Sequence, residues 1–300
     1  MSDLLLIPVC IITGILLVRI KSFPENAHKV INSLIVYVCL PALTLLYIPQ
    51  IKIGVDVIFP AIIMWIVFLL SVAFFVLLEK IFKWDRKNTG ALILTAGLAN
   101  TSFVGFPVLM ALFGEEGLKI GVIIDQVGSF LVLSTFGVIV ASVCSSGTYS
   151  LKKISLDIIR YPSFIAMIIS VILILAGFRH TDITRSVLQK LGSPVIILAL
   201  ISVGMQIKIK FNDNEFKEIF LGLSYKLILA PLAIYLIAVF LQLKGLVFQV
   251  SLIESAMPPM VMGSVLAVQF NLNPKLANLM VGIGIPLSFL TLSLWYLLAV

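Results

Sequence analysis

Charged residues are scarce in this chain. Only 12% of its 300 residues are Asp, Glu, Lys or Arg, whereas 61% are hydrophobic, and the mean hydropathy is strongly positive. This balance lies far outside the range of soluble domains. Long polar stretches are also lacking: no segment between apolar runs exceeds roughly a dozen residues, which is too short for a soluble catalytic or nucleic-acid-binding domain. The sequence therefore predicts a protein that works within a lipid bilayer.

Histidine and cysteine are scarce as well, which limits the available enzyme chemistry. Cys10, Cys39 and Cys144 all lie in apolar runs without regular spacing, so we expect neither a disulfide framework nor a zinc site. His28 and His180 lie at predicted membrane edges. No HExxH, GxGD or phosphate-binding Walker sequence occurs. We therefore expect no enzyme, no resident cofactor and no direct use of ATP.

Ten apolar runs approach the length of about 20 residues that a membrane-spanning helix needs. They predict an all-α membrane protein with ten transmembrane helices, over residues 4–18, 30–48, 55–78, 89–113, 118–144, 156–178, 187–207, 219–241, 246–270 and 276–299. The first run follows Asp3 in place of a basic segment, so we expect it to remain as a helix and not to be cleaved as a signal peptide.

The basic residues indicate the orientation in the membrane. Of the 21 Lys and Arg residues, fourteen fall at odd-numbered connections, six at even-numbered ones, and Lys226 is the remaining one. Basic residues gather on the cytoplasmic side, so both termini are expected outside a multi-pass protein of the cell (plasma) membrane. The net charge of +7 does not indicate a nucleic-acid partner, because no basic patch interleaved with aromatic residues occurs.

Prolines recur at similar positions in the two halves of the chain. Three prolines in the first, second and fourth runs are followed 154, 153 and 151 residues later by prolines in the sixth, seventh and ninth: Pro8, Pro41 and Pro107, then Pro162, Pro194 and Pro258. This spacing indicates an internal repeat of five helices. Because five is odd, the second repeat must be inverted in the membrane, as in many secondary transporters. We predict a first repeat over 1–144, a short cytoplasmic connector over 145–155 and a second repeat over 156–300.

Two runs contain a polar interruption that bears proline. The fourth run reads ANTSFVGFP over 99–107, and the ninth reads ESAMPPMVMGS over 254–264. Proline removes a backbone donor and clashes with the preceding turn, and Gly105 lets the chain leave helical geometry. Discontinuous helices in inverted-repeat carriers expose helix N-termini and unwound carbonyls near the membrane midplane. We therefore predict two broken helices that cross there; the alternative is that each proline only kinks its helix.

Three ionisable side chains lie deep in the runs: Asp125, Lys226 and Glu254. A charge at the bilayer centre costs at least about 2.5 kcal/mol, so such residues are functional candidates by default. Glu254 lies one helical turn before Pro258 and is expected to bind a sodium ion or a proton. Asp125 forms a polar face with Gln126 and Ser129, which is expected to line the same cavity. Lys226 is expected either to hold an anionic substrate or to balance an acid. The structural alternative is a charge network that only joins helices.

At these residues the sequence resembles the auxin efflux carrier family, which includes the plant PIN-formed auxin carriers and bacterial permeases for malonate and malate. The resemblance covers nearly the whole chain. It rests on INSLIVYVCLPALT in the second run, ANTSFVGFPVLMALFG in the fourth, KLILAP in the eighth, and AMPPMVMGSVLAVQFNLNPKLA from the ninth run into the tenth.

The resemblance implies ten helices in two inverted repeats. The first, second, sixth and seventh helices would form a scaffold that mediates homodimerisation, and the others a transport domain with elevator-like movement. Crossed breaks in the fourth and ninth helices would hold the substrate carboxylate. By this similarity the substrate site includes Thr44, Asn100, Pro107, Gln126, Pro258, Met260 and Val261, to which we add Thr101 and Pro259 from the interruptions themselves.

Some features depart from the plant carriers. The central connector is short, and Ala99 replaces a proline that often precedes the crossover asparagine. Asp125 and Glu254 are acids where plant members tend to be neutral, which puts ion-independent transport in doubt. Fold relatives among the bile acid sodium symporters bind sodium at a comparable glutamate, so by fold analogy a sodium ion is expected at Glu254, Asn100 and Thr101.

Together these features predict a secondary transporter of a small mono- or dicarboxylate, with Asn100 and helix N-termini receiving the carboxylate. Glu254, Asp125, Ser129 and Lys226 are the candidates for coupling transport to sodium or protons. Two alternatives stay open: a uniporter of an auxin-like aromatic carboxylate driven by the membrane potential, and a non-transporting sensor or channel. Membrane lipid and the carboxylate are the expected partners, besides a second copy of the chain.

Overall fold

The computed structural model describes residues 2–24, 26–51, 54–145, 160–207 and 215–300, and every regular element in these ranges is helical. Within them six helical stretches are long and apolar enough to cross a membrane: Ala27–Gln50, Val57–Phe82, Thr101–Cys144, Asp182–Gln206, Phe216–Phe240 and Pro274–Ala299. Shorter apolar helices cover Leu5–Leu17, Pro162–Leu175 and Gly245–Ser255. The predicted all-helical membrane protein is thus confirmed at this level. The predicted connector lies outside the described residues except for Ser145.

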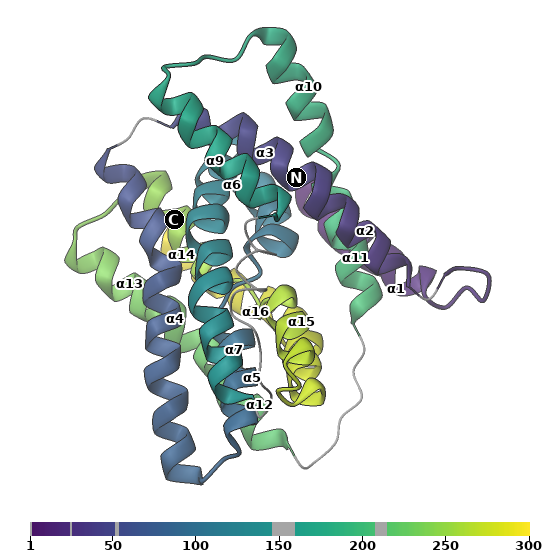
Figure 1. Cartoon of the computed structure of the whole chain (residues 1–300), viewed down its shortest axis with the longest axis vertical. Coiled ribbons are helices and arrows are strands. Elements are labelled where there is room, and N and C mark those ends of the chain that lie inside the picture. Colours follow the sequence, from purple (N-terminus) through teal and green to yellow (C-terminus); the bar gives the residue numbers. More distant parts are fainter. Residues whose placement is uncertain (1, 25, 52–53, 146–159, 208–214) are drawn as a thin grey trace.

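The first half of the chain contains the elements α1 to α7 (Figure 1). Their bounds are α1 Ser2–Leu17, α2 Ala27–Leu34, η1 Ile35–Cys39, α3 Leu40–Tyr47, η2 Ile48–Gln50, α4 Val55–Phe82, α5 Arg86–Ala96, η3 Thr101–Gly105, α6 Phe106–Ile123, η4 Ile124–Phe130, η5 Leu133–Gly137 and α7 Val138–Cys144. The π-helical turns η1, η3, η4 and η5 interrupt regular α-helical bonding inside the apolar runs. Such turns occur frequently at functional sites.

The second half contains α9 to α16. The bounds are α9 Pro162–Leu175, α10 Asp182–Gly192, α11 Val195–Gln206, α12 Phe216–Ser224, η7 Tyr225–Leu229, α13 Ala230–Phe240, α14 Gly245–Ser255, α15 Val261–Gln269 and α16 Pro274–Ala299. The predicted seventh run begins earlier than expected, because the amphipathic α10 precedes the apolar α11. Hydropathy alone does not reveal such a polar helix.

One glycine separates the fourth and fifth predicted runs. Gly114 has a φ of 64° and a ψ of −156°, inside an otherwise helical stretch from Phe106 to Ile123. Positive φ is readily adopted only by glycine. The chain therefore changes direction at Gly114, and the residues on both sides of it are helical. This position is close to the boundary between the fourth and fifth runs that the sequence predicts.

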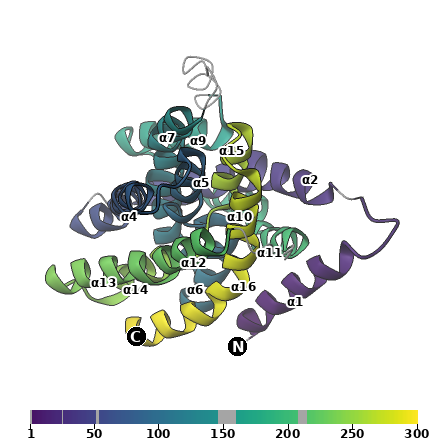
Figure 2. The same ribbon diagram turned by 90° about the horizontal axis from the view of Figure 1, so that it is seen from below.

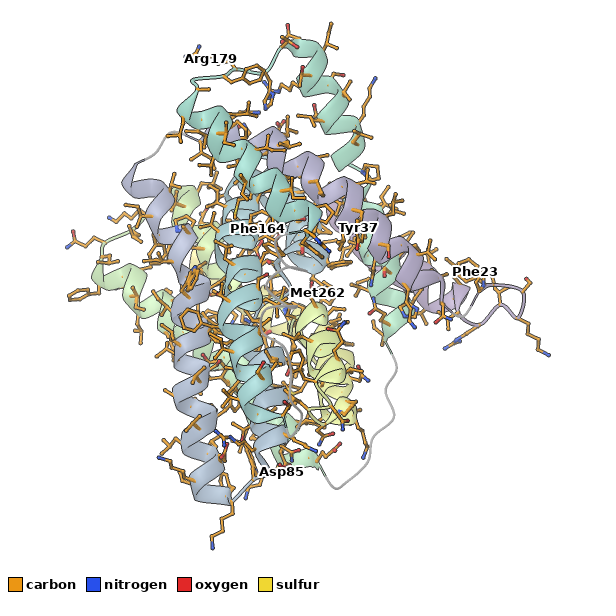
Figure 3. The ribbon with its side chains drawn as sticks, viewed as in Figure 1. Phe23, Tyr37, Asp85, Phe164, Arg179 and Met262 are labelled. Carbon is orange, nitrogen blue, oxygen red and sulfur yellow. The ribbon has the colours of Figure 1, made fainter. Side chains whose placement is uncertain are left out.

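The elements pack in two groups (Figures 1 and 2). The helices α1, α2, α3, α9, α10 and α11 contact one another, with α1 packed along α11 and α3 against α9 and α10. On the other side α4 contacts α5, η4 and α14, and α5 contacts α15 and α16. Charged connections lie at the ends of the long axis: Asp85 at one end and Arg179 at the other (Figure 3). The apolar middle of the molecule therefore lies between two polar ends.

The contact between α1 and α11 depends on glycine. A Cβ atom on Gly204 would lie 2.2 Å from the carbonyl oxygen of Ile11, and one on Gly14 would lie 2.2 Å from that of Ile201. Small residues let membrane helices approach closely and gain van der Waals contact. The two helices therefore come together at a surface that has no room for a side chain.

We expect Gly204→Val to separate these two helices. Overpacking typically costs about 1–3 kcal/mol, and the obstructing atoms here are backbone atoms that cannot rotate away. The melting temperature of the purified chain in detergent should fall by about 2–10 °C. Gly137→Val, the same replacement at another glycine, is the matched control, because the nearest obstruction there is a leucine side chain at 3.3 Å, which can rotate away. An equal effect of both changes would contradict the special role of this contact.

Candidate functional site

The fourth predicted run is broken, but at the N-terminal end of the predicted interruption: Gly105, with a φ of −61° and a ψ of −53°, and Pro107 both lie in helical segments, so neither makes the break. Helix α5 ends at Ala96, residues 97–100 are not helical, and η3 begins at Thr101. Asn100 has a φ of −82° and a ψ of 65°, and its Oδ1 atom accepts a hydrogen bond from the Phe103 N–H at 3.3 Å. Its Nδ2 atom is buried and has no hydrogen-bond partner among the described residues. Asn100 thus caps the new helix and keeps one donor free.

The ninth run is broken in a similar manner. Helix α14 ends at Ser255, residues 256–260 are not helical, and α15 begins at Val261. Pro258 and Pro259 occupy the gap, since neither can continue helical hydrogen bonding. The alternative of a simple proline kink is therefore wrong for both runs.

The two interruptions contact each other through the backbone. The Asn100 N–H donates to the Pro258 carbonyl oxygen at 2.9 Å, and the Met260 N–H donates to that of Thr95 at 3.2 Å. Ala99 and Pro259 form an isolated antiparallel bridge. Helix α5 packs against α15, while α14 packs against α6, so the halves of the two broken helices exchange partners at this point.

Polar side chains gather beside the first interruption. The Thr101 hydroxyl donates to Asp125 Oδ1 at 2.5 Å and also contacts Ser129 Oγ at 3.1 Å. Gln126 Nε2 donates to Asp125 Oδ2 at 2.8 Å. All four side chains are buried. The structure therefore brings together the predicted polar face on η4 and the predicted hydroxyl on η3.

Glu254, near the end of α14, lies against η3. Its side chain is fully buried, and a Cβ atom on Gly105 would lie 2.6 Å from its Oε1, so the carboxyl group packs directly against that glycine. A Cβ atom on Gly121 would lie 3.3 Å from the same oxygen. Neither carboxyl oxygen has a hydrogen-bond partner in the described part of the chain. The two glycines thus provide space for the Glu254 carboxyl group, whose oxygens remain available to accept hydrogen bonds or to bind a cation.

The alternative interpretation, a charge network that joins helices, is not formed by side-chain ion pairs within the described ranges. The salt bridges there are Lys119–Glu116, Arg185–Glu115 and Lys275–Glu215, and none includes Asp125, Lys226 or Glu254. Lys226 instead donates to the Ser255 carbonyl oxygen at 3.0 Å. The three intramembrane ionisable groups therefore each have a different environment.

A cavity of about 320 Å³ lies next to the crossing. Polar groups line one part of it, and apolar and aromatic side chains line most of the rest. Its lining residues are Val36, Leu40, Ser102, Phe103, Asp125, Gln126, Phe130, Leu133, Ser134, Val138, Tyr161, Ser163, Met260, Met262, Val265, Leu266, Gln269 and Phe270. Figure 3 shows Met262 about midway along the long axis. A cavity of this size and character is typical of a small-molecule site.

The predicted site residues divide into two sets. Asp125, Gln126 and Met260 line the cavity, whereas Asn100, Thr101, Pro107, Ser129, Pro258, Pro259, Val261, Lys226 and Glu254 lie at or near the crossing without being part of the cavity lining. Thr44 is separate from both sets. Its hydroxyl donates to the Leu40 carbonyl oxygen at 2.8 Å inside its own helix, and its own carbonyl accepts from Ser170 at 3.3 Å.

Sequence reasoning missed the aromatic wall of the cavity. Tyr161 stacks on Phe130 with ring centroids 5.1 Å apart, and both side chains line the cavity. An aromatic residue in an apolar run has the same pattern whether it faces lipid or a cavity. The backbone of Tyr161 is extended before Pro162, as the sequence predicts, but this conformation does not show which way the ring faces.

Buried polar groups at helix interruptions, beside a cavity in an apolar helical bundle, define a multi-span membrane protein built around an internal ligand-sized site. The chain belongs to the membrane transport protein family, whose model matches residues 1–296. This is the auxin efflux carrier family that the sequence resembles.

Similar proteins carry the same general description. The chain is 27% identical to an uncharacterized transporter of Methanocaldococcus jannaschii, over 98% of this chain and 97% of the relative. It is 27% identical to an uncharacterized transporter of Methanothermobacter thermautotrophicus, over 96% and 94%. It is 25% identical to the uncharacterized transporter YfdV of Escherichia coli, over 98% and 96%. The protein is therefore a membrane transporter.

Proposed function

We propose that this transporter is a secondary carrier of a small organic anion, with a carboxylate bound where the two interrupted helices meet. The observation that carries the proposal is the backbone pairing of Asn100 with Pro258, which places two helix beginnings, at Thr101 and Val261, beside one cavity. Helix N-termini favour anions, because their first N–H groups are unpaired and the helix dipole is positive there.

Two features of the crossing support this position for the carboxylate: the beginning of α15 and the Asn100 side chain. Helix α15 has no side-chain cap in the described structure, and Met260 and Met262 at its beginning line the cavity. Asn100 contributes the free Nδ2 donor on the opposite side of the crossing. An unpaired buried donor costs about 1–3 kcal/mol, a cost that a bound carboxylate oxygen would offset.

The architecture that goes with this function is the ten-helix inverted repeat, in a fold like that of the bile acid sodium symporters. Its support is the matched pair of interruptions and the grouping of α1, α2, α3, α9, α10 and α11, which correspond to the first, second, sixth and seventh runs. In the proposal these helices are the scaffold and the homodimer contact, and the remaining helices move as an elevator. Both termini face the outside of the cell membrane.

Glu254 and Asp125 are proposed to couple transport to a cation. Glu254 is buried with both carboxyl oxygens unpartnered in the described chain, and Asp125 is held by Thr101 and Gln126. A buried carboxylate requires a nearby cation or a proton. Movement of that cation with the anion would let an ion gradient drive transport.

Counterflow in proteoliposomes tests the carrier. Vesicles loaded with unlabelled carboxylate should accumulate the labelled compound transiently, and the initial rate should saturate with concentration. A channel gives flux without counterflow, and a sensor gives no flux; either result would contradict the proposal.

The cavity wall favours one narrower candidate, a uniporter or symporter of an aromatic monocarboxylate. Among the described residues that line the cavity there is no Lys or Arg, whereas Phe103, Phe130 and Tyr161 are present. A second carboxylate would lack a cationic partner there, while an aromatic body would contact the rings. Phenylacetate should therefore compete in the counterflow assay at lower concentration than malonate, and the reverse order would favour the dicarboxylate.

A further inference from the structure

Two consecutive prolines leave a backbone acceptor without its helical donor at the end of α14. In an α-helix the carbonyl of each residue accepts from the N–H four residues later. The donors for Glu254 and Ser255 would be residues 258 and 259, which are prolines and have no N–H. The Glu254 carbonyl instead accepts from the Met257 N–H at 3.2 Å. The Ser255 carbonyl needs a partner from elsewhere.

That partner is the side chain of Lys226. Its Nζ atom donates to the Ser255 carbonyl oxygen at 3.0 Å, and the side chain is fully buried. Lys226 lies in the π-helical turn η7, whose backbone contacts α12, α13 and α16. The lysine therefore brings a positive charge from another helix to the C-terminal end of α14.

The end of α14 is an electrostatically suitable place for a cation. A helix carries about half a negative charge at its C-terminus, where its last carbonyl oxygens are unpaired. In carriers with interrupted helices these ends coordinate the sodium ion or proton that drives transport. Glu254, the residue before Ser255, adds a carboxyl group at the same helix end.

We propose that the Lys226 ammonium group is a tethered cation that takes the place of a sodium ion at the end of α14, so that this end of the crossing binds no sodium. The inference rests on the carrier function proposed above and excludes sodium at this end of the crossing as its coupling ion. Lys226 then acts as a positioning residue, since it holds the interruption through Ser255. It is not a substrate ligand, and it is not among the residues that line the described cavity. Coupling at Glu254 is left to a proton.

Thermal unfolding of the purified full chain in detergent tests this without a known substrate. The wild-type chain should melt at the same temperature in sodium chloride, potassium chloride and choline chloride of equal ionic strength. Lys226→Ala should melt roughly 5 °C or more lower in choline chloride, because a charged donor is lost from a buried acceptor. Methylammonium or sodium should restore at least half of that loss, since each can occupy the vacated position. Lys226→Arg, which keeps the charge, should lie closer to the wild type.

Lys244→Ala is the matched control, because Lys244 is exposed and lies at the opposite end of the same helix. It should change neither the melting temperature nor its cation dependence. Stabilisation of the wild type by sodium relative to choline would overturn the inference. So would an alanine variant as stable as the wild type, or a loss that no small cation reverses.

Two arms do not depend on the folding of the alanine variant. The wild-type comparison of sodium with choline and the near-normal melting of Lys226→Arg decide the question even if Lys226→Ala cannot be purified. Because the unfolding measurement requires no transport, a failed counterflow experiment would contradict the proposed carrier function but would not affect the interpretation of the melting temperatures. A sodium-stabilised wild type that shows counterflow would contradict only the tethered cation.

Discussion

Replacing Asn100 with alanine should strongly reduce carboxylate uptake at low substrate concentration while the chain remains folded. The change removes Nδ2, the buried donor without a partner in the described structure, and Oδ1, which caps η3 at Phe103. A hydrogen bond to a charged group contributes about 1.5–3 kcal/mol, so affinity for the carboxylate should fall by about 10- to 150-fold. Loss of the cap should cost only about 1 kcal/mol of stability.

The two roles of Asn100 are separated by Asn100→Ser. Serine is as good a helix cap as asparagine and adds no charge to this buried position, so the melting temperature should stay close to that of the wild type. Its short side chain lacks the amide donor Nδ2, so uptake should fall nearly as far as with alanine. The measurements are initial uptake rates in proteoliposomes and thermal unfolding of the same preparations. Normal transport by either variant would show that Asn100 does not receive the substrate.

The interruption of the ninth run could be predicted from the sequence because two consecutive prolines, Pro258 and Pro259, remove two helical donors. A single proline is a weaker signal: Pro60 and Pro286 lie inside continuous helices, and Pro107 lies in α6 after the break in the fourth run. The contact between the two breaks could be predicted only because prolines recur at similar positions in the two halves of the chain. The backbone bonds between them, from Asn100 to Pro258 and from Met260 to Thr95, confirm that contact.

The environment of the buried charges could not be predicted in the same manner. Sequence placed Lys226 and Glu254 deep in apolar runs, but the partner of Lys226 is a backbone carbonyl, which every residue possesses. No side-chain pattern therefore points to Ser255 as the acceptor. The close approach of Gly105 to Glu254 is hidden for a related reason, since it depends on how two helical segments far apart in the sequence pack against each other.

The aromatic wall of the cavity could not be predicted from the sequence either. Phe130 and Tyr161 are far apart in sequence and stack only because η4 packs against α9. Thr44 illustrates the opposite case: the resemblance places it at the substrate, yet in this conformation its hydroxyl bonds within its own helix. A polar residue in an apolar run has two ways to be satisfied, by a ligand or by the preceding turn, and the sequence does not distinguish them.

Replacing Glu254 with glutamine should remove the dependence of uptake on a cation gradient. Glutamine keeps the shape of the side chain beside Gly105 and Gly121 but can neither carry a charge nor release a proton. Burial of an ionised carboxylate costs several kcal/mol unless it is paired. Because both Glu254 oxygens lack partners within the described residues, the variant should be at least as stable as the wild type.

Uptake into proteoliposomes with an imposed proton gradient, an imposed sodium gradient or neither distinguishes the coupling ions. The wild type should respond to the proton gradient, and Glu254→Gln should give the same slow, saturable rate under all three conditions. Glu116→Gln serves as the control, because Glu116 is an exposed glutamate that pairs with Lys119. If Glu254→Gln keeps the full response to the gradient, the buried carboxyl group is not the coupling site. In that case Asp125, held by Thr101 and Gln126 at the cavity, becomes the acid through which coupling must act.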